Sequence, residues 1–278
     1  MKRRSFLAAS GLIAAAAAIA PIVRASSSHG RSLDSICFQL YTARDLMAAD
    51  ADKTLSRLAA IGYDEVEFAG YHDHAPKDIR AMLDNAGLAA PSAHVPLEMI
   101  RKAPDALIDA AKIVGHDYLV LAWLAPPERQ SLDQYRSHAE LCNRFGERCK
   151  EAGIQLAYHN HEFEFEILDG ELPMDLLLAE VDADLMQIEL DLYWTVVAGQ
   201  DPIAFFNANA GRVALCHVKD RAEDGSMTDP GAGTIDFAAV FAESGVAGLR
   251  HYFVERDDAP DPLETAASAH SYLRDLTF

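Results

Sequence analysis

Eight strand-like segments alternate with eight helix-like segments along the chain of 278 residues, and this alternation constrains the fold more than any other feature. The strand-like segments are apolar, β-branched or aromatic runs at Ile36 to Thr42, Glu65 to Ala69, Ala90 to Val95, Tyr118 to Trp123, Gln155 to His159, Met186 to Asp191, Val213 to Val218 and Tyr252 to Glu255. The helix-like segments have apolar residues at helical spacing and lie at Ala51 to Ile61, Pro76 to Ala86, Ala103 to Val114, Leu132 to Ala152, Pro173 to Val181, Pro202 to Ala208, Ile235 to Ser244 and Pro262 to Leu276. Glycines mark the ends of six of these helices, at Gly62, Gly87, Gly115, Gly153, Gly211 and Gly245.

Eight strands, each followed by a helix, predict an α/β fold of the (β/α)8 or TIM-barrel type, which needs about 250 residues. The alternative is an open, doubly wound sheet. No Gly-x-Gly-x-x-Gly follows the first strand, which favours the barrel. We expect one catalytic barrel domain over residues 36–278, preceded by a flexible, serine-rich leader at 26–35.

Residues 1–25 predict an export signal. The pair Arg3-Arg4 lies in a basic start that is followed by an alanine-rich apolar run, and cleavage is expected after Ala25. The alternative is a membrane anchor, but Gly11 and Pro21 interrupt the run and alanine is only weakly hydrophobic. We therefore expect a periplasmic protein, exported by the twin-arginine route, with no membrane contact after cleavage.

The net charge narrows the classes of molecule that this protein could bind. The chain has 24 Lys and Arg against 43 Asp and Glu, a formal charge of −19, and the signal holds four of the basic residues and none of the acidic ones. Nucleic acids bind through Lys and Arg, so DNA and RNA are excluded as default partners.

Cys142 and Cys149 lie two helical turns apart, beyond disulfide reach, and we expect all four cysteines to be free and mostly buried.

Polar residues at the ends of the predicted strands indicate a metal site, because TIM-barrel active sites lie at the carboxyl ends of the strands. The last four strands end in His159, Asp191, His217 and Glu255. Mixed imidazole and carboxylate ligands suit Mn²⁺, Zn²⁺, Fe²⁺ or Co²⁺ better than Ca²⁺ or Mg²⁺, and we expect one such ion. Each residue also has an ordinary alternative: Asp191 as a helix cap, Glu255 as an ion-pair partner of Arg256, and His217 as a core histidine.

Other strand-end residues suit a polyol, because they offer hydrogen bonds or a ring that stacks on a sugar face. These substrate-binding candidates are Gln39, Glu67, His94, Trp123, Trp194 and Arg256. Glu67 and His94 are the strongest, because each interrupts an otherwise apolar strand. The expected partner is a small carbohydrate.

Five motifs follow one another at the spacing of the strands: Tyr158-His-Asn-His-Glu-Phe-Glu-Phe165, Glu189-Leu-Asp-Leu-Tyr-Trp194, His217-Val-Lys-Asp220, Gly231-Ala-Gly-Thr-Ile-Asp-Phe237 and Val254-Glu-Arg256. In this order they resemble the sugar phosphate isomerase/epimerase family, which has a xylose isomerase-like TIM barrel. The resemblance implies one divalent metal held by Glu, Asp, His and Glu at the ends of strands 5 to 8. Asp191, His217 and Glu255 match three of these ligands, but His159 stands where the family often has glutamate, and Glu164 is the fallback ligand.

The resemblance implies a metal-dependent isomerase or epimerase of sugars or keto-sugars that acts through an enediolate. Three alternatives stay open: an inosose-type dehydratase, a lyase or hydrolase of 3-keto-glycosides with the same metal site, and a periplasmic sugar-binding barrel without catalysis. The absent glutamate weakens two-base epimerisation and favours β-elimination with one base and one acid. Glu255 or Glu164 is the predicted base, and Lys219, His161 or His94 the predicted acid.

Overall fold

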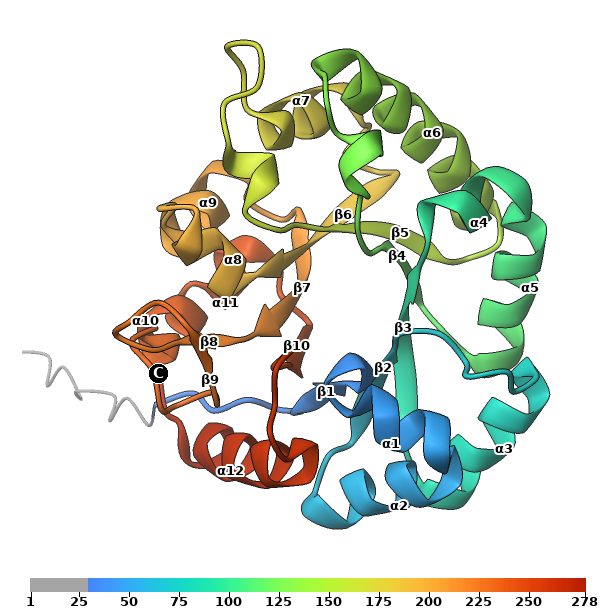
Figure 1. The fold of residues 1–278 in the computed structure, drawn as a ribbon, viewed down its shortest axis with the longest axis vertical. Coiled ribbons are helices and arrows are strands. Elements are labelled where there is room, and N and C mark those ends of the chain that lie inside the picture. The colour runs from blue at the N-terminus through green and yellow to red at the C-terminus, as the bar shows by residue number, and fades with distance from the viewer. Residues whose placement is uncertain (1–29) are drawn as a thin grey trace, which may run out of the picture. The chain divides into compact units, whose positions relative to one another are not determined.

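The computed structural model describes residues 30–278, in which eight parallel strands close into a barrel (Figure 1). The barrel strands are β1 (Cys37–Gln39), β2 (Glu65–Phe68), β3 (Ala89–Val95), β4 (Tyr118–Leu121), β5 (Gln155–His159), β6 (Met186–Asp191), β7 (Val213–Val218) and β10 (His251–Val254). Their order around the barrel is the order of the chain, with β10 closing onto β1. The predicted (β/α)8 fold is confirmed.

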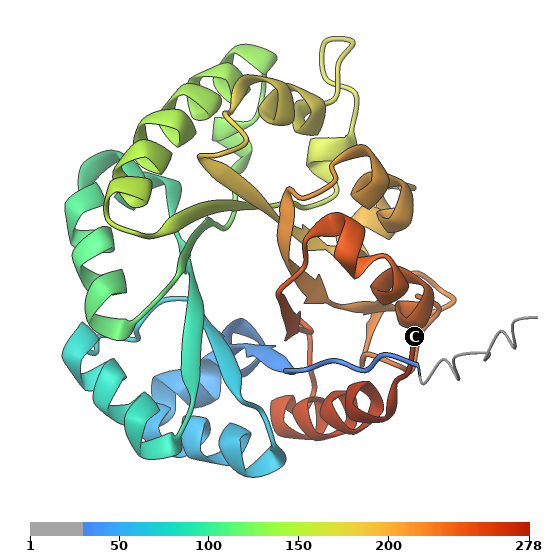
Figure 2. The same ribbon diagram turned by 180° about the vertical axis from the view of Figure 1, so that it is seen from behind.

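Helices form a ring outside the strands, as the two opposite views in Figures 1 and 2 show. They are α1 (Arg44–Ala49), α2 (Ala51–Ile61), α3 (Pro76–Ala86), α4 (Leu97–Lys102), α5 (Pro104–Val114), α6 (Leu132–Glu151), α7 (Pro173–Glu180), α8 (Leu192–Val197), α9 (Pro202–Ala208), α10 (Phe237–Ala242), α11 (Ser244–Ala247) and α12 (Pro262–Asp275). Short 3-10 turns lie at η1 (Leu40–Ala43), η2 (Pro126–Glu128) and η3 (Phe163–Phe165).

Local chemistry sets the limits of these helices. Asp50 caps α2 by accepting a hydrogen bond from the Lys53 amide at 3.0 Å. Pro76 opens α3 at a position that needs no amide donor, and Gly87 ends it in the left-handed region with φ of 73°. The predicted limits of α2, α3 and α9 are confirmed at both ends.

Strand residues alternate between two cores, because successive side chains of a strand point to opposite faces. One set, which includes Phe38, Val66 and Tyr158, packs with the helices in the large outer core. The other set fills the barrel interior as a smaller cluster of Cys37, Tyr118, Val120, Ala157, Ala214, Leu215 and Phe253. Polar residues replace this apolar filling toward the carboxyl ends of the strands.

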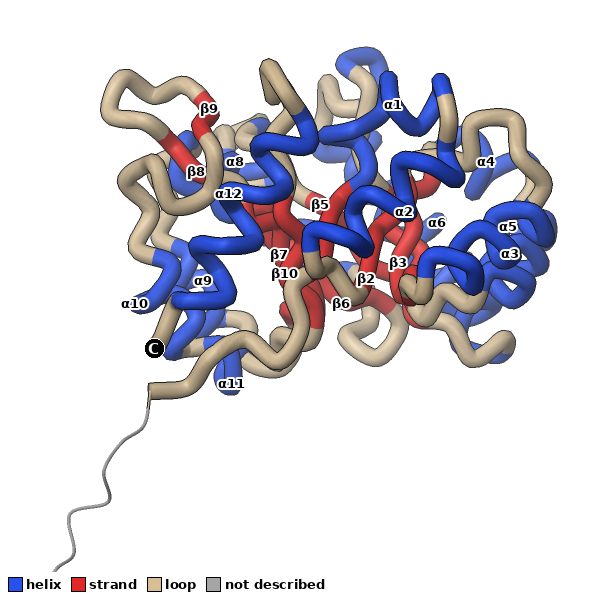
Figure 3. Tube along the Cα trace, turned by 90° about the horizontal axis from the view of Figure 1, so that it is seen from below, coloured by secondary structure: helices blue, strands red, loops and turns tan. Residues whose placement is uncertain are grey.

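Several elements differ from the sequence-based prediction. Helices α1, α4 and α8, and the hairpin of β8 (Asp220–Arg221) with β9 (Met227–Thr228), follow strands where loops were expected. In Figure 3, α1, α4 and the hairpin lie at one end of the barrel. The prediction that Gly245 ends a helix is wrong: it lies inside α11, and Gly248, with φ of 86°, ends that helix.

The predicted signal, residues 1–25, and residues 26–29 of the predicted leader lie outside the described residues. Arg31 exchanges two backbone hydrogen bonds with Phe278, at 2.7 and 2.9 Å, so the chain joins the domain before Ile36. Residues Arg31–Phe278 form one compact unit. Within residues 30–278, no helix is both long enough and apolar enough to span a membrane.

Candidate active site

The four predicted metal ligands lie together at the carboxyl ends of neighbouring strands. His159 ends β5, Asp191 ends β6, His217 is in β7 and Glu255 follows β10. All four are at most 3% exposed, and one potential ligand atom from each lies within 4.8 Å of the others. The strand register brings them together, because Asp191 pairs directly with His217.

The potential ligand atoms that face one another form no hydrogen bond of good geometry among the described residues, and their close polar contacts are with one another and with Lys219. These atoms are His159 Nε2, Asp191 Oδ2, His217 Nδ1 and Glu255 Oε2. His217 Nδ1 lies 2.7 Å from Glu255 Oε2, and His159 Nε2 lies 3.4 Å from Asp191 Oδ2. Two imidazole nitrogens and two carboxylate oxygens that converge within 4.8 Å of one another are a ligand set that fits a divalent cation.

The remaining polar atoms of three of these residues hold the side chains in place. His159 Nδ1 lies 3.1 Å from the Ala122 carbonyl oxygen, and His217 Nε2 lies 2.8 Å from Glu67 Oε1. Asp191 Oδ1 accepts the Trp194 amide at 2.9 Å, so Asp191 caps α8 and also presents Oδ2 to the cluster. The alternative of a helix cap and that of a ligand are therefore compatible. Such outer contacts orient metal ligands in proteins.

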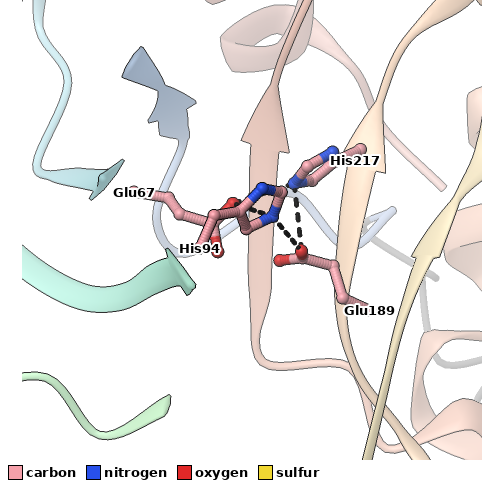
Figure 4. A group of neighbouring side chains, drawn as sticks. All are labelled: Glu67, His94, Glu189 and His217. Atoms are coloured by element: carbon pink, nitrogen blue, oxygen red, sulfur yellow. Dashed lines mark hydrogen bonds and ion pairs between the residues drawn. The ribbon is translucent and has the colours of Figure 1, made fainter. Parts of the chain in front are cut away.

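A second tier of polar side chains, two buried and one partly exposed, lies directly beside His217 (Figure 4). Glu67 from β2, His94 from β3 and Glu189 from β6 surround the Nε2 side of its ring. His94 Nε2 lies 2.7 Å from Glu189 Oε2 and 3.3 Å from Glu67 Oε1, and His217 Nε2 lies 3.2 Å from Glu189 Oε2. Glu67 also accepts hydrogen bonds from Gln39 Nε2 and Ser92 Oγ.

The carboxylates of the site strongly favour positive charge between them. Burial by itself would lower the pKa of His217, but Glu189 and Glu255 raise that pKa well above its usual value. Burial likewise opposes the charged form of Asp191, yet Lys219 and the neighbouring histidines hold the pKa of Asp191 well below its usual range. The site therefore attracts a cation.

Lys219 lies between the candidate ligand group and Asp257. Its Nζ lies 3.1 Å from Asp191 Oδ2, 2.9 Å from Glu255 Oε2 and 3.0 Å from Asp257 Oδ1. These carboxylates raise the pKa of Lys219 well above its usual value, although burial acts in the opposite direction. Burial and Glu255 raise the pKa of Asp257 to about 6.

A pocket of about 940 Å³ opens above this group. Its inner end is lined by His159, Lys219 and Glu255, and its outer part by Trp123, which is 47% exposed, and by Tyr41, which is 44% exposed. Arg101 and Glu128 also line the pocket and form a bidentate ion pair, with both N···O distances 2.8 Å. The volume is within the range of about 300–1,000 Å³ of small-molecule sites.

The other predicted substrate-binding residues lie in different places. His94 and Trp123 line the pocket, whereas Gln39 and Glu67 are fully buried beneath it. Arg256 is not part of the pocket lining: its side chain forms ion pairs of 3.0 Å with Asp229 and 2.9 Å with Asp258.

The loop after β5 presents His161 to the pocket, whereas Glu164, in η3, and Trp194, in α8, are not part of the pocket lining. His161 stacks on Phe163 with ring centroids 5.2 Å apart and lies 5.7 Å from the Trp194 ring centroid. Glu164 is fully buried, where its two oxygens accept hydrogen bonds from the Tyr158 hydroxyl at 2.6 Å and the His161 amide at 2.7 Å. Glu164 therefore shapes the loop that carries His161.

Sequence reasoning missed two residues of the site, Glu189 and Asp257. Each lies two positions from a predicted ligand: Glu189 shares a face of β6 with Asp191, because side chains two apart in a strand point the same way, and Asp257 follows Glu255 in the loop after β10. The carboxylate at Glu189, inside an apolar strand, was the signal that could have identified it.

Comparison with known proteins identifies relatives of the same architecture. The sequence model of the xylose isomerase-like TIM barrel family matches residues 55–276. An inosose dehydratase from Lacticaseibacillus casei is 29% identical over 163 residues, which cover 51% of this chain and 54% of that protein. The chain thus spans about half the length of the curated relatives that it first matches.

Solved structures agree with this match. A sugar phosphate isomerase/epimerase from Parabacteroides distasonis ATCC 8503 is 28% identical, with a TM-score of 0.74 over 92% of this chain and 98% of that one. The IOLI protein, solved with a bound zinc atom, is 17% identical and shares the fold, with a TM-score of 0.70 over 88% of this chain and 99% of that one. The chain belongs to the xylose isomerase-like TIM barrel family.

Proposed function

We propose that this protein is a divalent-metal-dependent lyase that removes water from a keto-polyol or keto-sugar by β-elimination. One observation carries the proposal: four potential metal-ligand atoms converge at the inner end of a pocket, directly beside Lys219 and Asp257. The sequence had favoured an isomerase or epimerase, with a dehydratase as an alternative. That alternative now has the stronger support, because curated relatives of this chain are inosose dehydratases.

The predicted cation would be held by His159, Asp191, His217 and Glu255. Zn²⁺, Mn²⁺, Co²⁺ or Fe²⁺ bound there would polarise a substrate carbonyl and acidify the hydrogen on the adjacent carbon. His94, Glu67 and Glu189 keep the His217 ring oriented from its other side.

The base and the acid are assigned from their positions in the pocket. Glu255 lines the pocket and removes the proton next to the carbonyl, whereas both oxygens of Glu164 are occupied in the interior. Lys219 lines the pocket 2.9 Å from Glu255 and gives a proton to the departing hydroxyl group. One C–H and one C–O bond break, one C=C bond forms, and water leaves, with no change in oxidation state overall.

The distribution of carboxylates supports elimination over epimerisation. Epimerisation by two bases needs a proton acceptor on each face of the sugar. Here Glu255 and Asp257 both lie after β10, while β5, on the other side of the ligand group, presents imidazoles from His159 and His161. Elimination needs one base and one acid, which the β7 and β10 ends supply.

The experiment is incubation of Mn²⁺-, Co²⁺- or Zn²⁺-loaded protein with keto-inositols, ketohexoses and 3-keto-glycosides, followed by mass spectrometry. The account predicts a product lighter than its substrate by one water, and loss of that activity in Glu255→Gln. A product of unchanged mass would establish an isomerase or epimerase. Saturable sugar binding without turnover would favour a binding barrel.

The pocket favours a second candidate, a lyase of 3-keto-glycosides. The same elimination would then expel an alcohol from C1 in place of water. The volume of about 940 Å³ and the exposed Trp123 at its outer part suit a substrate with a second ring. Release of the aglycone from a 3-keto-glycoside, weakened about tenfold or more in kcat/KM by Trp123→Ala, would support this candidate. Unchanged kinetics in that variant would oppose it.

A further inference from the structure

A second group of side chains that could bind a metal lies inside the barrel, at the end where its strands begin and away from the pocket. Cys37, Glu65 and His251 are the first residues of β1, β2 and β10, and Cys37 pairs directly with Glu65. Cys37 Sγ lies 3.1 Å from Glu65 Oε2, and His251 Nδ1 lies 2.7 Å from the same oxygen. A potential ligand atom from each residue lies within 4.8 Å of the other two.

This composition is unusual for the interior of a barrel at the end where its strands begin. Barrel interiors are commonly filled by layers of branched aliphatic side chains. Here Cys37 belongs to the interior cluster with Tyr118 and Phe253, and His251 stacks against Phe253 with centroids 6.0 Å apart. A thiol, a carboxylate and an imidazole thus converge among aromatic rings, where burial of each polar group is costly.

The group of Cys37, Glu65 and His251 is accessible to a small ion from solvent. Cys37 is fully buried, whereas the side chains of Glu65 and His251 are 21% and 15% exposed. The group therefore combines an enclosed thiol with two ligands that reach solvent at the end of the barrel. A cation bound here would have access to water as a fourth ligand, because Glu65 and His251 reach solvent.

We propose that Cys37, Glu65 and His251 bind one zinc-type divalent cation, at a site separate from the candidate active site. Thiolate, imidazole and carboxylate are a ligand set for Zn²⁺ or Co²⁺ and a poor one for Mg²⁺ or Ca²⁺. On binding, Cys37 releases its thiol proton to water and Sγ bonds to the cation. His251 moves its remaining proton to Nε2, so that Nδ1 becomes a ligand, and no redox step occurs. The cation would tie β1, β2 and β10 together where the barrel closes.

Cobalt distinguishes this site from the active-site group, because only a thiolate ligand gives a near-ultraviolet sulfur-to-cobalt charge-transfer band. The active-site group contains no sulfur, and of the described cysteines only Cys37 lies in a potential metal-binding group. Protein stripped of metal is titrated with Co²⁺ while its absorption and its bound cobalt are measured.

The proposal expects two Co²⁺ per chain and a charge-transfer band in the wild type. Cys37→Ser should lose the band and one equivalent of cobalt. The matched control Cys216→Ser removes another buried strand thiol, one that packs in the outer core, and should keep both. Asp191→Asn should lose the active-site equivalent and keep the band.

Two results would overturn the proposal: a wild-type protein with one Co²⁺ and no charge-transfer band, or a band that persists in Cys37→Ser. The wild-type spectrum decides the matter even if that variant fails to fold. His251→Gln, which retains the thiol, is the second variant and should weaken Co²⁺ binding at this site by about tenfold or more.

Discussion

Both ring nitrogens of His217 lie close to carboxylates. Nδ1 faces Glu255 at 2.7 Å among the candidate metal ligands, while Nε2 lies 2.8 Å from Glu67 and 3.2 Å from Glu189. A carboxylate behind a ligating histidine fixes its tautomer and makes the ring a stronger donor. We therefore expect the second tier to position His217.

Loss of the Glu189 charge should loosen this positioning of His217. Glu189→Gln retains the shape of the side chain but removes its charge, so metal affinity should fall by about 10–100-fold. Calorimetric titration of metal-free protein with Zn²⁺ measures this change, with the exposed helix residue Glu151→Gln as a control. Equal affinities in Glu189→Gln and the wild type would show that the second tier does not act on His217.

We predict that Glu164 makes the stability of the folded protein depend on pH. Burial raises its pKa to about 8 in the folded protein, above the value of about 4.3 in an unfolded chain. The folded state therefore binds this proton more tightly, and stability falls as pH rises from about 4.3 to about 8.

In Glu164→Gln this contribution is absent. The stability of the variant relative to the wild type should therefore rise with pH by at most about 1.4 kcal/mol per unit. Urea unfolding at several pH values between about 5 and 8 measures it. A difference that stays constant over this range would contradict the assignment of a buried, protonated Glu164.

The ligand group could be predicted from single residues, because each of its members lies at, or one residue from, the carboxyl end of a strand. The contacts of the second tier with His217 could not be predicted, because Glu189 lies inside β6 and only the closed barrel brings it beside His94 and His217. Cys37, Glu65 and His251 open their strands at positions distant in sequence, and the pairing of β1 with β2 and β10 unites them.

Elements with strong boundary chemistry could be predicted closely, and short elements could not. The limits of β5, β6 and β7 agree with the sequence prediction. Helices α1, α4 and α8 are six residues long, too short for a helical period to stand out, and they depend on packing against the barrel.

Two glycines in helices should respond to substitution in opposite ways. In α6, a Cβ at Gly146 would lie 2.8 Å from the Leu185 carbonyl oxygen and 3.0 Å from the Leu185 Cβ, so backbone must move. Gly146→Ala should destabilise the protein by about 1–3 kcal/mol, despite the better helix propensity of alanine.

Gly245, in α11, is the matched control, because a Cβ there would contact nothing within 4 Å. Gly245→Ala should be neutral or stabilise by up to about 1 kcal/mol. Urea unfolding of both variants measures the contrast. Stabilisation of similar size in both would contradict the close packing of α6 against Leu185.

At the scale of the whole molecule, the count of eight strand and helix pairs was sufficient to predict the architecture. The barrel closes because β1 pairs with both β2 and β10, and this pairing carries every strand end to one rim. The reaction could not be predicted in the same way, because the same end of this barrel can support several reactions. The residues that decide between them differ by single side chains, such as His159 in place of the glutamate that the resemblance implies.

The amino-terminal sequence predicts where the protein works. We propose export to the periplasm and cleavage after Ala25, from the basic start with Arg3-Arg4 and the apolar run that follows. Expression in a bacterium with a twin-arginine pathway should give periplasmic protein that begins at Ser26 by intact-mass analysis. Replacement of both arginines by lysine should retain the precursor in the cytoplasm. Uncleaved protein in the wild type would contradict the assignment.

The most direct test of the proposed chemistry is the mass of the product that metal-loaded protein forms from a keto-inositol in D₂O. The account predicts a product that has lost one water, formed by the wild type and abolished in Glu255→Gln. A product that keeps every oxygen and differs from its substrate only by deuterium next to the carbonyl would contradict elimination and establish proton transfer of the epimerase kind.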